Sequence, residues 1–162
     1  MRALALLCLA ACGGSASSAD PVTTAEASST CADFSAHATT CGWGGNINGV
    51  DWNCGEAAAL WRADVFRAVA SCAIDLPCAG SGASCSALAT GNEPLAIHDQ
   101  YATRCQERKT ECSLTASGDV SALILLCQAE RLSAYGTPVI DAILACFDQP
   151  CASVVACLDD VL

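Results

Sequence analysis

The sequence predicts an all-α protein built from two tandem, disulfide-stapled six-cysteine units behind a disordered N-terminal tether. Three observations lead to this fold class. Twelve cysteines after residue 30 divide into two sets with nearly the same spacing. Apolar residues before the last cysteines of each set recur at helical intervals. No stretch of useful length alternates apolar and polar residues as a half-buried strand would.

The chain begins with a positively charged residue and a short apolar run. Arg2 is followed by nine residues, 3–11, that are apolar and include Cys8. This layout predicts an export signal over residues 1–11. The run is too short to span a membrane, which takes roughly 20 residues.

The end of this run carries a more specific signal. The residues Leu9-Ala10-Ala11-Cys12 resemble the lipobox of bacterial lipoproteins. The resemblance implies that Cys12 is lipidated, becomes the N-terminus and anchors the protein to a bacterial membrane, with Gly13 compatible with the outer membrane. The alternative is an ordinary secretory signal cut after Ala19, which removes Cys12 and predicts a secreted protein.

Residues 12–30 then form the predicted tether. The segment GGSASSADPVTTAEASST is low in bulky apolar residues and is rich in Ser, Ala, Thr and Gly. Such a composition is typical of a flexible linker rather than of part of a core. The folded part is expected in residues 31–90 for the first unit and 91–162 for the second.

The cysteines of the two units are the main structural element. Twelve cysteines in an exported chain indicate an oxidising compartment and disulfides rather than free thiols. The first set comprises Cys31, Cys41, Cys54, Cys72, Cys78 and Cys85, and the second Cys105, Cys112, Cys127, Cys146, Cys151 and Cys157. Each set allows 15 connectivities, and the sequence does not choose among them.

The two sets also agree in their side chains. Residues 65–72, VFRAVASC, align without a gap on residues 139–146, VIDAILAC. Just beyond, Asp-Leu-Pro-Cys at 75–78 aligns on Asp-Gln-Pro-Cys at 148–151. The sequence therefore predicts a tandem duplication.

Local signals place the helices. Asn53 followed by Glu56 can cap a helix over about 54–73, and residues 136–138, Gly-Thr-Pro, split the matching stretch into helices near 120–134 and 138–147. The Asp-x-Pro-Cys signature predicts a helix start. Three or four short helices are expected in each unit.

Helical geometry limits the disulfide pairing. Cys105 and Cys112 are seven residues apart, and Cys151 and Cys157 six. On a helix these pairs are separated by roughly 9–10 Å, whereas a disulfide needs Cα atoms within about 7 Å. Each cysteine should therefore bridge to another helix.

Charge and motifs exclude several functions. The chain has 17 acidic and 7 basic residues, and without Arg2 the balance is 17 to 6, a net charge of −11. Nucleic-acid binding is therefore not expected, because phosphate recognition needs clustered Lys and Arg. No Cys-x-x-Cys, P-loop or Gly-x-Ser-x-Gly occurs. No metal and no cofactor are predicted.

One loop resembles a known enzyme family. Cys41-Gly42-Trp43-Gly44-Gly45, followed by Asp51, is similar to the calcium-binding loop of secreted phospholipases A2. The resemblance implies a calcium-dependent hydrolase with His98 as the base and Asp99 as a calcium ligand. The family places its His-Asp pair soon after this loop, but here His98 follows Cys54 by 44 residues. The competing interpretation makes His98-Asp99 the start of a solvent-facing helix.

The three tryptophans, Trp43, Trp52 and Trp61, all lie in the first unit. They could form an aromatic platform for a sugar or a peptide, but packing over a small core is favoured, with Trp61 against Val65.

Taken with the lipobox-like residues and the absence of a catalytic motif, the sequence predicts no enzyme but a lipid-anchored, extracytoplasmic module. Its expected partners are the membrane, through Cys12, and an unidentified protein or glycan.

Overall fold

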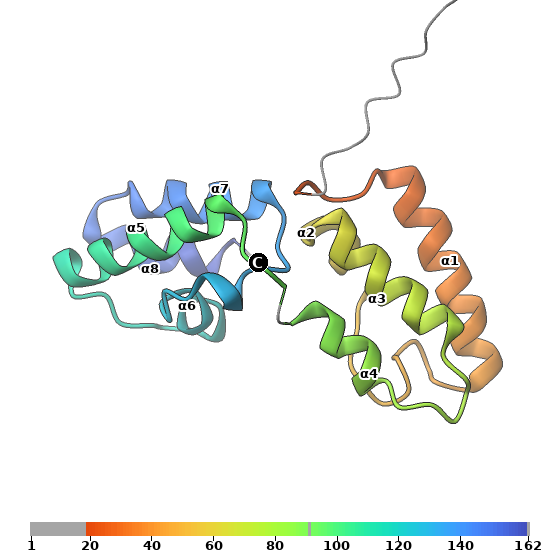
Figure 1. Cartoon of the computed structure of the whole chain (residues 1–162). Coiled ribbons are helices and arrows are strands. Elements are labelled where there is room, and N and C mark those ends of the chain that lie inside the picture. The colour runs from red at the N-terminus through yellow and green to blue at the C-terminus, as the bar shows by residue number, and fades with distance from the viewer. Residues whose placement is uncertain (1–18, 91, 162) are drawn as a thin grey trace, which may run out of the picture.

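A computed structural model describes residues 19–90 and 92–161. Within these ranges the fold is all-α, as predicted, with two isolated β-bridges and no strand. The first helices are α1 (Thr24–Cys41), α2 (Cys54–Leu60), α3 (Ala63–Asp75) and α4 (Ala83–Ser86), followed by the 3₁₀ turn η1 (Ala87–Ala89). The second group comprises α5 (Ala96–Cys112), α6 (Asp119–Ile124), η2 (Ala129–Arg131), α7 (Thr137–Phe147) and α8 (Cys151–Asp159). Figure 1 shows α1–α4 gathered on one side of the molecule and α5–α8 on the other.

The predicted tether is wrong over its last residues. Of residues 12–30, the part up to 18 lies outside the described residues, but α1 begins at Thr24. The Thr23 side chain caps this helix by accepting the Glu26 N–H, 3.3 Å away. Val22, just upstream, is buried. Ala and Glu favour a helix, the Thr23 cap begins it, and Glu26 pairs with Arg67 of α3 at 2.5 and 2.8 Å.

The helix predicted over 54–73 is broken in the middle. Asn53 caps α2 as expected, accepting the Glu56 N–H at 3.2 Å. At Trp61 and Arg62, however, the backbone is extended, and α3 starts only at Ala63. Helical propensity does not reveal this break, because it arises from backbone pairing with the second half of the chain.

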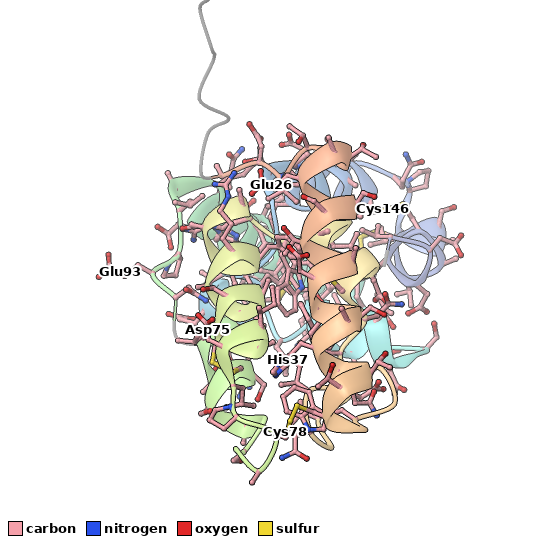
Figure 2. The ribbon with its side chains drawn as sticks, turned by 90° about the vertical axis from the view of Figure 1, so that its right-hand side faces the viewer. Glu26, His37, Asp75, Cys78, Glu93 and Cys146 are labelled. Atoms are coloured by element: carbon pink, nitrogen blue, oxygen red, sulfur yellow. A yellow bond between two sulfur atoms is a disulfide. The ribbon has the colours of Figure 1, made fainter. Side chains whose placement is uncertain are left out.

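The core of the first half lies between α1 and α3. Figure 2 shows these helices side by side, with Glu26 near one end and His37 and Cys78 near the other. Phe34 of α1 packs edge-on against Trp52, with 4.7 Å between ring centroids, and the Phe66 ring of α3 lies 6.5 Å from the same indole.

The Gly-rich loop closes α1 and covers one end of this core. Gly42 adopts φ 71°, a left-handed conformation that ends α1 and favours glycine. Trp43 and Trp52 are buried, which confirms the prediction that the loop tryptophans pack over the core. The Trp43 indole N–H donates to the Cys78 carbonyl at 3.1 Å.

The second half has its own core around α5, α7 and α8. Tyr101 of α5 and Phe147 of α7 are fully buried, with ring centroids 6.4 Å apart. The Asp-x-Pro-Cys signature precedes a helix only here, where α8 starts at Cys151 right after Pro150. No helix starts at Cys78, and Asp148 caps no backbone N–H but pairs with Arg104 at 3.1 Å.

All twelve cysteines after residue 30 form disulfides. The pairs are Cys31–Cys54, Cys41–Cys78 and Cys72–Cys85 in the first half, and Cys105–Cys127, Cys112–Cys151 and Cys146–Cys157 in the second. Numbered in chain order, both sets join first to third, second to fifth and fourth to sixth. No bridge crosses from one set to the other. The two cysteines of α5 and the two of α8 each bridge to another segment, as helical geometry requires.

The identical connectivity supports the predicted duplication, which stays a prediction. The boundary between residues 90 and 91 also stays one, because residue 91 lies outside the described residues.

Candidate functional site

The two halves meet at a short antiparallel backbone pairing. Trp61 and Tyr135 form an isolated bridge. It is flanked by two hydrogen bonds of 2.8 Å, from the Arg62 N–H to the Ala134 carbonyl and from the Gly136 N–H to the Leu60 carbonyl. The bridged residues are thus a non-hydrogen-bonded pair, in which opposite side chains stand on one face with Cβ atoms about 4.5–5.5 Å apart.

This junction joins equivalent positions of the repeat. Extending the gap-free alignment upstream from Val65 and Val139 places Trp61 on Tyr135. The two flanking hydrogen bonds are also equivalent, since each unit donates one and accepts one. The N-terminal segment completes the arrangement: the Asp20 carbonyl accepts from the Ala63 N–H at 2.8 Å and the Ala19 carbonyl from the Thr137 N–H at 2.9 Å.

A buried arginine ties the junction together. The Arg62 guanidinium donates to the Ser133 carbonyl at 3.2 Å and to the Glu93 carbonyl at 3.0 Å. It also forms a two-pronged ion pair with Asp64, at 3.1 and 2.6 Å. The Arg62 side chain is only 9 % exposed. One side chain therefore links α3, the segment before α5 and the segment before α7.

His98 lies beside the Tyr135 carbonyl, and its position does not fit the role that the phospholipase resemblance implies. It is fully buried rather than solvent-facing. Its Nδ1 accepts the Leu95 N–H at 2.9 Å, and its Nε2 lies 3.1 Å from the Tyr135 carbonyl. Both nitrogens are therefore used by backbone groups. Because Nδ1 accepts a backbone N–H, the ring carries its proton on Nε2 and is neutral, and burial, which lowers the pKa of His98, favours this form.

The phospholipase alternative therefore loses its catalytic residue. His98 is enclosed in the second half, whereas the Gly42–Gly45 loop belongs to the first. Asp99 is exposed and lines a cavity between α5 and α7 instead. Within residues 19–90 and 92–161, no three His, Cys, Asp or Glu side chains are grouped as metal ligands. The structure gives no support to a calcium-dependent hydrolase.

A cavity of about 260 Å³ opens where the two halves meet. The two bridged aromatic residues, Trp61 and Tyr135, both half-buried, form part of its wall. The remaining lining residues are Asp51, Trp52, Asn53, Glu56, Ala57 and Leu60. The cavity is thus walled by aromatic rings and carries two carboxylates.

Both carboxylates of this cavity lack a cation. Asp51 and Glu56 are exposed, and no Lys or Arg of the described ranges lies within 4.0 Å of either carboxylate. The negative charge of Glu56 contributes, after burial, to raising the pKa of Tyr135. Glu56 and Tyr135 line the same cavity.

Trp52, whose side chain contributes to this wall, carries an unsatisfied donor. Its indole is 8 % exposed, and Nε1 is buried without a hydrogen-bond partner among the described residues. Buried polar atoms are nearly always hydrogen-bonded, so an unpaired one needs an explanation.

Another cavity, of about 440 Å³ between α5 and α7, differs because its carboxylates have a cation beside them. It is lined by Asp99, Glu107 and Asp148 but also by Arg104. Arg104 pairs with Asp148 at 3.1 Å and with Glu107 at 3.5 Å. Two of its three carboxylates therefore already have a cation, which makes the junction cavity the better candidate site.

Sequence reasoning identified only part of this site. The sequence predicts Trp52 and Trp61 as a potential aromatic platform, and it places Asp51 in the Gly-rich loop. It predicts a capping role for Glu56, and no local pattern indicates Tyr135, which is 74 residues away from Trp61. The one available signal was the alignment of Tyr135 with Trp61. The lipidation site Cys12 and the signal 1–11 lie outside the described residues.

Comparison with known proteins returned no match: no family model, no curated protein and no solved structure corresponds to this chain.

Among the helices of the described residues, none is long and apolar enough to cross a membrane. The chain is thus a disulfide-rich helical protein, and its six bridges indicate an oxidising, extracytoplasmic environment.

Proposed function

We propose that the chain is an exported, lipid-anchored module of the bacterial envelope, without catalytic activity, that binds a partner through its folded part. The observation that carries this proposal is the division of the cysteines. All twelve after residue 30 are bridged, whereas Cys12 ends the lipobox-like residues Leu9-Ala10-Ala11. A thiol held out of the disulfide framework is available for a lipid.

The architecture supports a binding rather than a catalytic role. The junction cavity has an open, aromatic and anionic wall. His98, the residue that the phospholipase resemblance would make a base, is enclosed and neutral. The N-terminal segment reaches the folded part at Ala19 and Asp20, beside the same junction. An anchor at Cys12 would therefore hold the junction within a few residues of the membrane surface.

The test is the intact mass of the mature protein from its native host. We expect an N-terminus at Cys12 carrying acyl chains and a gain of about 12 Da on reduction, two hydrogens for each bridge. Cys12→Ser should abolish acylation and membrane partitioning, and the matched variant Cys8→Ser should leave both unchanged. An unacylated N-terminus at Asp20 would refute the anchor and establish a secreted protein.

A further inference from the structure

We propose that the junction cavity binds a single organic cation, the guanidinium or ammonium group of a basic side chain on a partner protein. This inference deepens the proposed function. It rests on that proposal only in assuming that the partner lies outside the cytoplasm. Two features converge on it: carboxylates without a counter-ion and aromatic rings held on one face of a backbone bridge.

The carboxylates supply the charge. Asp51 and Glu56 line a cavity of about 260 Å³ that no Lys or Arg of the described residues enters. In the α5–α7 cavity, by contrast, Arg104 occupies the equivalent role toward Asp148. The chain also carries a net charge of −10, which attracts cations from a distance. A bound cation would supply the positive charge that no Lys or Arg of the described residues brings to these two carboxylates.

The aromatic walls supply the shape. Cations bind favourably over the faces of Trp and Tyr rings, and more strongly when water is excluded. Trp61 and Tyr135 stand on the same side of their bridge, one from each half of the molecule. The Arg62 guanidinium and the His98 ring fix the backbone on which these two residues sit. The backbone that carries the two rings is therefore held in place before any ligand binds.

Trp52 adds a third aromatic ring to the cavity wall. Its Nε1 is buried without an acceptor among the described residues, so a group in the open cavity does not reach it. The guanidinium or ammonium group of a basic side chain can pair with the carboxylates and also lie over the rings, and its apolar stem can pack against them. A hydrated inorganic cation can pair only with the carboxylates.

The test uses the full-length, oxidised protein and two probes that differ only in charge. These are Nα-acetyl-arginine amide and the isosteric Nα-acetyl-citrulline amide. Binding is followed by the indole N–H signals of the three tryptophans in two-dimensional NMR. Trp52 and Trp61 line the cavity, whereas Trp43 donates to Cys78 elsewhere and serves as an internal control.

We expect the arginine probe to shift the Trp52 and Trp61 signals with a Kd on the order of 1 mM at low salt, and not the Trp43 signal. The citrulline probe should bind about tenfold more weakly, and 0.5 M salt should weaken the arginine probe about threefold or more. Glu56→Gln and Asp51→Asn should each weaken binding by about threefold. Asp141→Asn, an exposed site on α7 with the same change in net charge, should have no effect.

Several results would overturn the inference. These are equal binding of the citrulline probe, no shift of either cavity tryptophan, or equal effects of Glu56→Gln and Asp141→Asn. A neutral sugar such as N-acetylglucosamine shifting the same two signals independently of salt would also overturn it, because the cavity would then be a glycan platform. None of these results bears on acylation of Cys12, so the two proposals fail separately.

Discussion

Replacing Arg62 by leucine should loosen the junction between the two halves. The substitution keeps much of the apolar stem but removes the guanidinium. The Ser133 carbonyl, in a buried residue, then loses a charged donor at 3.2 Å, and the Glu93 carbonyl loses one at 3.0 Å. Asp64 also loses its partner, but its side chain is 44 % exposed and can be hydrated instead.

The magnitude follows from these contacts. Each hydrogen bond from a charged donor contributes about 1.5–3 kcal/mol, and a buried carbonyl left unpaired costs about 1–3 kcal/mol. The variant also avoids the cost of desolvating a guanidinium on folding, and this gain offsets part of the lost stability. We expect a net loss of about 2–4 kcal/mol in the free energy of unfolding. Arg62→Lys retains the charge but lacks the planar guanidinium. Its free energy of unfolding should lie between those of the wild-type protein and of Arg62→Leu.

The assay is urea unfolding with the disulfides intact, followed by tryptophan fluorescence. Arg67→Leu is the matched control, because Arg67 lies in α3, close to Arg62 in the sequence, and also contacts one carboxylate twice, that of Glu26, at 2.5 and 2.8 Å. That pair is exposed, 49 % and 31 %, and should contribute less than about 1 kcal/mol. If the two leucine variants lose the same stability, the assignment of Arg62 as the central link of the junction is refuted.

Three titrations give further predictions. Burial lowers the pKa of His98, so the unfolded state binds the extra proton. The free energy of unfolding should therefore fall by up to about 1.4 kcal/mol per pH unit as the pH drops below about 6.5, and urea titrations of His98→Gln should lack this slope. Glu56→Gln should lower the raised pKa of Tyr135, measured by ultraviolet absorbance, and an unchanged value would contradict the proximity of these side chains. Ser117 donates to Asp159 and lowers its pKa, so Ser117→Ala should raise that pKa in a carbon-detected NMR titration.

The sequence by itself determined the helical class, the oxidising compartment and the bridging of cysteines between segments. These properties follow from local chemistry: helical periodicity at 139–147, the Asn53 cap and the spacing of Cys105 and Cys112 are all readable within a few residues. The aligned blocks also predicted that both units would share one plan, and the two sets of bridges have the same connectivity.

Only the tertiary structure decided which cysteines pair, where α2 ends and where the junction cavity lies. The break at Trp61 arises because Leu60 and Arg62 exchange hydrogen bonds with Gly136 and Ala134, residues more than 70 positions away. The start of α1 within the predicted tether depends on both levels: Thr23 caps it locally, and Glu26 pairs with Arg67 of α3. Long-range pairing depends on the positions of both segments at once, and no local pattern in either segment records those positions.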